Sequence, residues 1–455
     1  MPYVVGAVHL AVMALYFHGF RGSFLGGDSG DYFVLGKAIV TGVFEAPRVD
    51  RAIGYPLVLS AAYGLLPSAP FAVAIALNYV FYMLTISWIG RLSDAVGLGT
   101  TAGRVAQLLF ALVPNMAIFA NLVMTEVLAA LLLCIGTDLV VRAASSGDDA
   151  RARNPKRLVF AGAVAAALFL VRSEYLLVLP VLLAVCLVAG RGRAPRTTRL
   201  GGRGIVTAGV GFLAVVLTVN VFVRAAAPAG ITMGAAPSLL YRSLWLSFYD
   251  LELTHFRLHV VNGLSERVHT LRGDEIAQRL EAVRLDYTGG SPLPDRMMAA
   301  MRRDLESMRT HGLGMDEGQR HAGVPYLRVF AERFAAQPLE YFRRTGLRLF
   351  YAMAAVDLDW PTLRNHLIHS AVLVPVSAGA YLSCLVLLAR RRTRTLAVAL
   401  VGVAGAYSAI VHGALVYDQR YILPAVPLLS ILSALGLLNW TAIRAWLPEV
   451  ERAHA

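Results

Sequence analysis

The chain has 455 residues, of which 57% are hydrophobic and only 16% are charged, and its mean hydropathy is +0.60. A soluble protein normally carries about 25% charged residues, so this composition excludes an ordinary soluble fold. The net charge of +13 does not indicate nucleic-acid binding, because the arginines gather in short loops between apolar segments, where they set membrane topology.

The apolar segments have the length of helices that cross a bilayer, which is roughly 20 residues. Because lipid offers the backbone no hydrogen-bond partner, we expect an all-α, polytopic transmembrane helix bundle. The first segment lacks a basic start and a small-residue cleavage site, so it is expected to remain as an uncleaved span. About ten spans are predicted, over 3–20, 70–90, 103–121, 125–143, 157–171, 174–190, 205–224, 366–389, 396–414 and 421–446.

Arginine-rich loops follow Val141, Gly190 and Ala389. If these loops are cytoplasmic, the ten spans alternate without contradiction and both termini lie in the cytoplasm. We therefore predict a multi-pass protein of the bacterial inner (plasma) membrane. The three cysteines all lie inside apolar segments without the spacing of a metal site, so no metal ligands are predicted among them.

The topology divides the chain into three parts. Residues 1–225 are expected to form an N-terminal transmembrane module that contains the first outer loop, 21–70. Residues 226–364 are too polar to cross the membrane and are expected to form a small helical extracytoplasmic insert, with an amphipathic helix over Pro338–Val356 that lies on the membrane surface. Residues 365–455 are expected to form a C-terminal transmembrane module.

The first outer loop carries two carboxylates directly after the first span. Asp28 and Asp31 precede a helical pattern that begins at Tyr32. Asp28 or Ser29 suits the N-cap of that helix and Asp31 suits its positive end, so both acids also have a purely structural interpretation. Gly54 opens a second, amphipathic helix. We therefore predict two juxtamembrane helices in this loop.

The motifs of this loop resemble those of a known enzyme family. Asp28 followed by Tyr32, and then the run from Arg51 through Gly54 and Tyr55 to Pro56, are similar to the first periplasmic loop of the GT-C glycosyltransferases. These integral-membrane enzymes use polyprenyl-phosphate sugars, and they include aminoarabinose transferases, arabinofuranosyltransferases and protein O-mannosyltransferases. Three later segments also resemble motifs of this family, in the same order along the chain and on the same predicted side of the membrane. They are Pro114 with Thr125-Glu126, Arg172-Ser173-Glu174, and Arg420-Tyr421-Ile422-Leu423-Pro424.

This sequence departs from the family pattern at Ala52-Ile53, where the family usually has a proline pair. The resemblance implies a GT-C-like fold and a glycosyltransferase that moves a sugar from a polyprenyl-phosphate donor to a lipid, polysaccharide or protein acceptor. No P-loop or dinucleotide-binding fingerprint is present, which disfavours a cytoplasmic nucleotide sugar as the donor.

Sugar transfer of this kind needs a carboxylate that takes the acceptor proton. Because the lipid carrier sits in the bilayer, this group must stand at the outer membrane boundary. Asp28 is the candidate catalytic base, and Asp31 either orients the acceptor or takes the base role itself. Glu126 is a candidate for holding sugar hydroxyls, and it would complete an acidic pair if a divalent metal ion takes part as a cofactor.

Cations must hold the departing phosphate as charge grows on it. Arg420 is the candidate phosphate ligand, with Lys37 or Arg172 helping, because guanidinium binds phosphate through paired hydrogen bonds. The structural alternative is that Arg172 pairs with Glu174, and Arg420 with Asp418, as anchors at the membrane interface. The remaining candidates for substrate contact are Arg51, Tyr55 and Tyr421, and Tyr55 either stacks on the sugar or merely covers the loop.

Two other functions are compatible with the same spans. A transporter or flippase of lipid-linked saccharides would share the outer arginines, but it should show charged or broken helices at mid-membrane. A non-catalytic envelope assembly protein would use the outer insert to bind a partner. The clustering of the acids in an outer loop favours the transferase.

Overall fold

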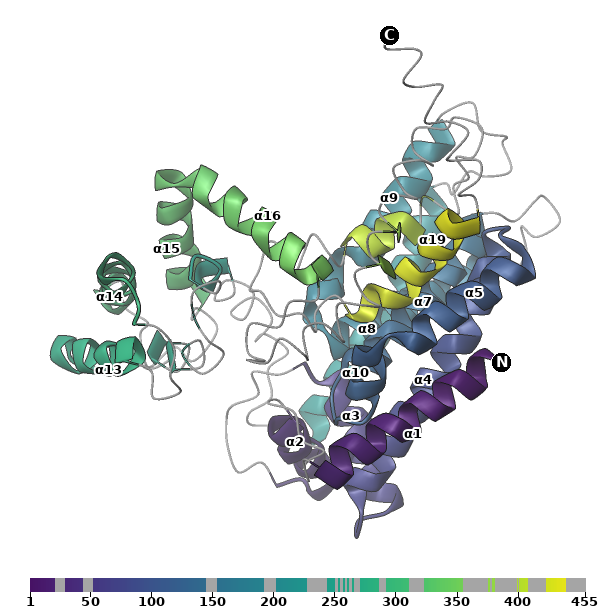
Figure 1. The fold of residues 1–455 in the computed structure, drawn as a ribbon, viewed down its shortest axis with the longest axis horizontal. Coiled ribbons are helices and arrows are strands. Elements are labelled where there is room, and N and C mark those ends of the chain that lie inside the picture. The colour runs from purple at the N-terminus through teal and green to yellow at the C-terminus, as the bar shows by residue number, and fades with distance from the viewer. Residues whose placement is uncertain are drawn as a thin grey trace. The chain divides into compact units, whose positions relative to one another are not determined.

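A computed structural model of the chain is entirely helical in the elements that its described residues form (Figure 1). The chain divides into two compact units, which are treated separately here: residues 1–231, 367–409 and 420–455 form the first, and residues 232–366 and 410–419 form the second. The described residues are 1–20, 29–43, 52–144, 154–191, 202–226, 244–249, 271–285, 292–310, 323–354, 401–407 and 423–438, with the isolated positions 253, 257, 260–261, 264–265, 375–376, 379–380 and 399.

Five predicted spans of the N-terminal module are single helices. They are α1 (Pro2–Phe20), α4 (Pro70–Ala95), α7 (Glu126–Ala144), α8 (Asn154–Val171) and α10 (Gly202–Ala226). Among the described residues, three helices are long and apolar enough to cross a membrane, namely α4, α7 and the Gly204–Phe222 part of α10. These helices make the chain a membrane protein, and the total of ten spans remains a prediction.

The predicted span over 103–121 is bent rather than continuous. α5 (Gly99–Leu112) and α6 (Pro114–Ala120) meet at an angle of 64°, and counting them as one span raises the described spans to four. Pro114 has no N–H to donate and disfavours helical backbone in the residue before it, and Val113 is accordingly extended. The predicted span over 103–121 is therefore interrupted at Val113.

The sixth predicted span also starts with a break. The 3₁₀ helix η2 (Ser173–Leu177) precedes α9 (Val178–Arg191), and Arg172 before it has extended backbone. In the C-terminal module, the predicted span over 366–389 lies almost wholly outside the described residues. Residues 401–407 within 396–414 are helical, and α19 (Val426–Leu438) lies within 421–446.

The first unit is a bundle in which neighbours in sequence are mostly neighbours in space. α4 packs on α5 and α7, α8 packs on α7 and α10, and α19 packs on α5 (Figure 1).

Two glycines bring α8 and α10 into backbone contact. A Cβ added to Gly162 would collide with the carbonyl oxygen of Ala208, and one added to Gly211 would collide with that of Val159. Small residues allow this close approach in membranes, where packing must replace the hydrophobic effect.

The described part of the second unit includes four helices, where the sequence predicts a small helical insert and an amphipathic helix. They are α13 (Gly273–Leu285), α14 (Asp295–Thr310), α15 (Gly323–Ala336) and α16 (Pro338–Ala354). Their core includes a buried carboxylate. Asp304 accepts hydrogen bonds from the Trp245 indole at 2.8 Å and the Tyr249 hydroxyl at 2.6 Å, and it pairs with Arg333 at 2.7 Å. The carboxylate therefore has the polar partners that a buried charge requires.

Candidate active site at the outer loops

The two predicted juxtamembrane helices are present as α2 (Ser29–Thr41) and α3 (Gly54–Leu65). They pack on one another, and α3 also packs on α4 and α8. α2 is tied by its first residue to the segment between α6 and α7. The buried Ser29 hydroxyl donates to the carbonyl oxygen of Val123 at 2.9 Å and lies 3.7 Å from the sulfur of Met124. This tertiary contact holds Ser29, the residue after Asp28, against the segment that precedes Glu126.

The start of α3 lies directly on the chain that leads to Arg172. A Cβ added to Gly54 would stand 2.7 Å from both the carbonyl carbon of Leu170 and the amide nitrogen of Val171. Real side chains do not approach backbone this closely, so this contact requires glycine. The start of α3 is thereby fixed against the end of α8.

Tyr55 follows this glycine and is 1% exposed. Its hydroxyl donates to the side-chain oxygen of Asn78 at 3.1 Å, and its ring meets Tyr32 edge to face at 5.5 Å. Burial raises the pKa of Tyr55 above its ordinary value, and the nearby negative charge of Glu126 raises this pKa further although the Asn78 hydrogen bond opposes the shift. The phenol is therefore neutral and enclosed, which favours the covering role over stacking on a sugar.

A buried ion-pair network joins the start of α7 to residues 172–174. Glu126 is the first residue of α7, where the positive end of the helix favours a carboxylate. Arg172 donates from Nη1 to Oε1 of Glu126 at 3.2 Å and from Nε to Oε1 of Glu174 at 2.6 Å. Arg172 is 6% exposed and Glu126 is 1% exposed. This network therefore contains two carboxylates around one guanidinium.

Polar residues that sequence analysis did not select complete the cluster. The side-chain amide of Asn78 donates to the carbonyl oxygen of Leu122 at 2.7 Å, and the Tyr79 hydroxyl donates to the side chain of Asn121. The Tyr407 hydroxyl, from the C-terminal module, donates to the carbonyl oxygen of Glu174 at 2.7 Å. An amide inside an apolar span is costly without a partner, so Asn78 carried a usable signal in the sequence.

The structure brings together Tyr55, Glu126 and Arg172 of the predicted site. The predicted Arg172–Glu174 pair is present. Asp31 and Lys37 lie on α2 and are exposed. Four predicted site residues lie outside the described part of the chain, namely Asp28, Arg51, Arg420 and Tyr421. In the described part, no group of three or more His, Cys, Asp or Glu side chains could hold a metal ion.

No family model and no curated protein matches this sequence. Two solved proteins resemble the chain along nearly its whole length. One is the archaeal oligosaccharyltransferase AglB from Archaeoglobus fulgidus in complex with an inhibitory peptide and a dolichol-phosphate, at 16% identity over 98% of this chain and 52% of that chain, with a TM-score of 0.48. A structure of the oligosaccharyltransferase from Archaeoglobus fulgidus with Zn and sulfate matches at 16% identity and a TM-score of 0.49, over 97% of this chain and 51% of the other.

The second protein is ArnT from Cupriavidus metallidurans bound to undecaprenyl phosphate. It matches at 14% identity over 95% of this chain and 77% of that chain, with a TM-score of 0.40. This chain spans about half the length of the oligosaccharyltransferase.

Proposed function

We propose that this chain is a membrane glycosyltransferase that moves a sugar from a polyprenyl-phosphate donor to an acceptor on the outer face of the inner membrane. The observation that supports the proposal is the convergence of three segments, each predicted to lie on the outer side, on one buried cluster of charged side chains. Ser29 binds the segment before Glu126, Gly54 lies on the chain before Arg172, and Arg172 joins Glu126 to Glu174.

The chemistry of the cluster fits transfer from a lipid phosphate. Phosphate leaves as a stable anion, so the main requirement is a base for the acceptor hydroxyl and cations for the donor. Asp28 is the proposed base because it directly precedes Ser29, which is held against the segment between α6 and α7. Asp31 is the second candidate. The AglB and ArnT structures contain dolichol-phosphate and undecaprenyl phosphate, which belong to the proposed donor class.

Arg172 takes a revised role in this proposal. Its Nε and Nη1 atoms both donate to carboxylates, so it is placed to hold Glu126 and Glu174 rather than to bind the donor phosphate. We assign it as a positioning residue for Glu126, which in turn is proposed to hold sugar hydroxyls. The proposed phosphate cations are then Arg420, Lys37 and Arg51.

The bend between α5 and α6 is compatible with the broken helix of a transporter, but the acid within α7 does not support this alternative. Asp138 lies within α7, but it pairs with Arg142 one turn later, at 2.8 Å, near the predicted cytoplasmic end. Such an i, i+4 pair satisfies both charges locally. It does not provide the mid-membrane polar site that a transporter needs.

The test is complementation of a deletion strain, with cell-envelope glycans and glycolipids profiled by mass spectrometry. Wild type should restore one glycosylated product, and Asp28→Asn should not, although it inserts into the membrane at normal levels. Glu332→Gln is the matched control because Glu332 is an exposed acid on α15, paired with Arg328. It should restore the product fully.

Two outcomes would decide against the proposal. If Asp28→Asn and Asp31→Asn both keep the full product, neither acid is the base and a transport or structural role is favoured. If the wild-type chain changes only the side of the membrane on which a saccharide is found, and the set of saccharides that carry the added sugar stays the same, the chain is a transporter.

A further inference from the structure

Asn78 is a fully buried amide inside the apolar helix α4. Its side-chain oxygen accepts a hydrogen bond from the Tyr55 hydroxyl at 3.1 Å, and its side-chain nitrogen donates to the carbonyl oxygen of Leu122 at 2.7 Å. An apolar side chain is easier to bury than an amide, and the backbone of α4 does not need a side-chain partner. The two hydrogen bonds to other segments therefore give the amide its role.

The nitrogen of this amide acts on the side of the ion pair that carries Glu126. Leu122 lies in the segment between α6 and α7, and its carbonyl oxygen also accepts from the Met124 amide at 2.9 Å, which makes the turn tight. The chain then enters α7, whose first residue is Glu126. The position of the Leu122 carbonyl thus sets where α7 begins and where the Glu126 carboxylate meets Arg172.

Side chains hold the two neighbours of Leu122 in the same way. Tyr79, the next residue of α4, donates from its hydroxyl to the side-chain oxygen of Asn121. Ser29 of α2 donates to the carbonyl oxygen of Val123 at 2.9 Å. Three consecutive residues before α7 are therefore fixed by side chains, and two of these side chains come from α4.

The oxygen of the same amide acts on the other side of the ion pair. It holds Tyr55, which directly follows Gly54. The Cβ position of Gly54 lies 2.7 Å from the amide nitrogen of Val171, the residue before Arg172. Asn78 is therefore hydrogen-bonded to both of the segments that meet in the ion pair.

We propose that Asn78 is a positioning residue, which sets the geometry of Glu126 and Arg172 through Leu122 and Tyr55 without touching the substrate. The inference rests on the proposed function, in which Glu126 holds sugar hydroxyls. A small misplacement of such a group lowers the rate of the reaction much more than it lowers stability. An amide that only stabilised the bundle would change the amount of folded protein and leave the rate per folded molecule as it is.

The first measurement is the initial rate of product formation in the complemented deletion strain, divided by the amount of folded protein in the membrane. Asn78→Leu has a side chain of similar size and removes both hydrogen bonds, so this rate should fall by about tenfold or more. Thr85→Val is the matched control, because Thr85 is buried on the same helix and its hydroxyl donates only to the Phe81 carbonyl one turn earlier. It should keep the wild-type rate.

The second measurement is hydrogen–deuterium exchange of the purified full chain in detergent, which does not depend on sugar transfer. In Asn78→Leu, the amides of residues 121–129 should exchange faster, while those of α8 and α10 keep their wild-type protection. Asn78→Asp should recover the wild-type protection of 121–129 in acidic buffer, compared at equal pH. A protonated carboxyl offers one donor and one acceptor as the amide does, whereas an ionised one can only accept.

Three results would overturn the proposal. Unchanged exchange over 121–129 in Asn78→Leu would show that the amide does not hold this segment. Faster exchange with an undiminished rate per folded molecule would show a purely structural role. If Asn78→Asp fails to recover protection in acidic buffer, donation to Leu122 is not the link, and this variant also serves if Asn78→Leu does not fold. Failure of the proposed function itself is recognised separately, because the wild-type chain would then form no glycosylated product.

Discussion

Arg172 shows how a single residue holds distant parts of the chain together. It lies 3.2 Å from Glu126 and 2.6 Å from Glu174, and its side chain is 6% exposed. A buried charge needs its partners, because removing one partner leaves the other desolvated and uncompensated. The structural contribution of Arg172 can therefore be measured without knowing the substrate.

We expect Arg172→Met to lower the free energy of unfolding by about 3–5 kcal/mol, because two carboxylates lose their shared cation. Arg172→Lys should lower the free energy of unfolding by less, because the lysine ammonium keeps the positive charge. It cannot donate in both directions as the guanidinium does. The measurement is thermal unfolding of the purified protein in detergent.

The control for this prediction is Arg328→Met. Arg328 pairs with Glu332 at 3.0 Å, but both side chains are more than half exposed. Water already solvates such a pair, so the expected cost is only about 0–1 kcal/mol. Equal losses in the two variants would show that Arg172 has no special structural role.

At the scale of elements, the orientation of α3 depends on one glycine. The Cβ position of Gly54 lies 2.7 Å from the backbone of Leu170 and Val171, whereas that of Gly64 in the same helix has no atom within 4 Å. The start of α3 and the end of α8 meet at this point. A change here should therefore disturb the candidate site without altering any charged group.

We expect Gly54→Ala to destabilise the protein by about 1–3 kcal/mol, as overpacking does, or to move α3 away from α8. Gly64→Ala should be neutral or stabilise by up to about 1 kcal/mol, because alanine is the better helix former. Thermal unfolding of both variants tests this. If the two variants change the thermal stability by the same amount, the close contact at Gly54 is wrong.

The contact between α8 and α10 gives a second prediction at this scale. We expect Gly162→Ala to cost about 1–3 kcal/mol, because its Cβ would collide with the Ala208 carbonyl and force the two helices apart. Gly209→Ala, where the Cβ meets no atom within 4 Å, is the control. Resistance to proteolysis in detergent should fall in the first variant and not in the second.

At the scale of the whole molecule, the predicted orientation places α2 outside the membrane and the end of α4 in the cytoplasm. Lys37 on α2 and Asp94 near the end of α4 are both exposed, so each can carry a probe. In right-side-out spheroplasts, a membrane-impermeant maleimide should label Lys37→Cys and should not label Asp94→Cys. In inverted vesicles the pattern should reverse. Labelling of both positions from the same side would refute the topology.

Hydropathy alone was enough to predict most helices, because a span must satisfy its own backbone hydrogen bonds and must be apolar over a fixed length. α7 and α10 agree with their predicted spans within a few residues. The insert was expected to be helical, with an amphipathic helix over Pro338–Val356, and α16 lies in that range. The break at Val113 was missed although Pro114 signals it directly.

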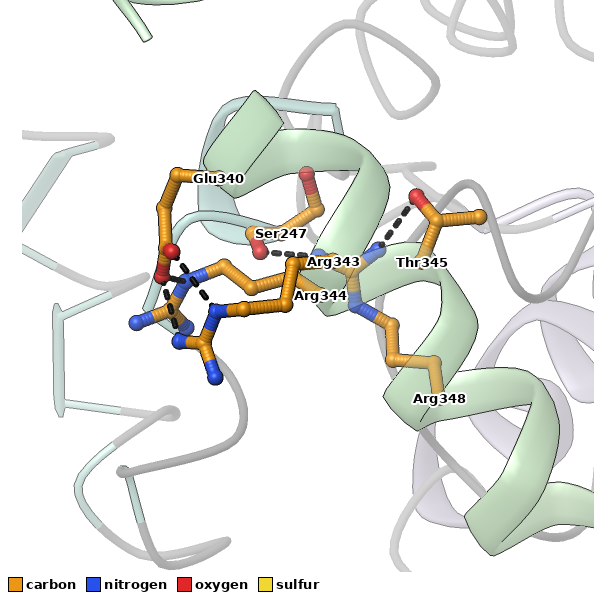
Figure 2. Close-up of polar contacts among 6 residues, drawn as sticks. All are labelled: Ser247, Glu340, Arg343, Arg344, Thr345 and Arg348. Carbon is orange, nitrogen blue, oxygen red and sulfur yellow. Dashed lines mark hydrogen bonds and ion pairs between the residues drawn. The ribbon is translucent and has the colours of Figure 1, made fainter. Parts of the chain in front are cut away.

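The candidate site was only partly predictable. The sequence marked Tyr55, Glu126 and Arg172 through motif order and membrane side, and the structure brings these residues together. The sequence gave no sign that Arg172 donates hydrogen bonds to two carboxylates at once. The burial of Arg348 on α16, where it donates to the carbonyl oxygen of Ser247 (Figure 2), was equally invisible. An amphipathic pattern does not say which face of a helix meets protein.

The sequence by itself therefore determined the class of the protein, the approximate extent of its helices and the side of the membrane on which its acids are expected. These properties follow from local composition, since the bilayer acts on each segment separately. Only the tertiary structure decided which outer residues meet, because contacts such as Gly54 with Leu170 or Ser29 with Val123 join segments about a hundred residues apart. Such contacts depend on shape and hydrogen bonding between helices, which no local pattern records.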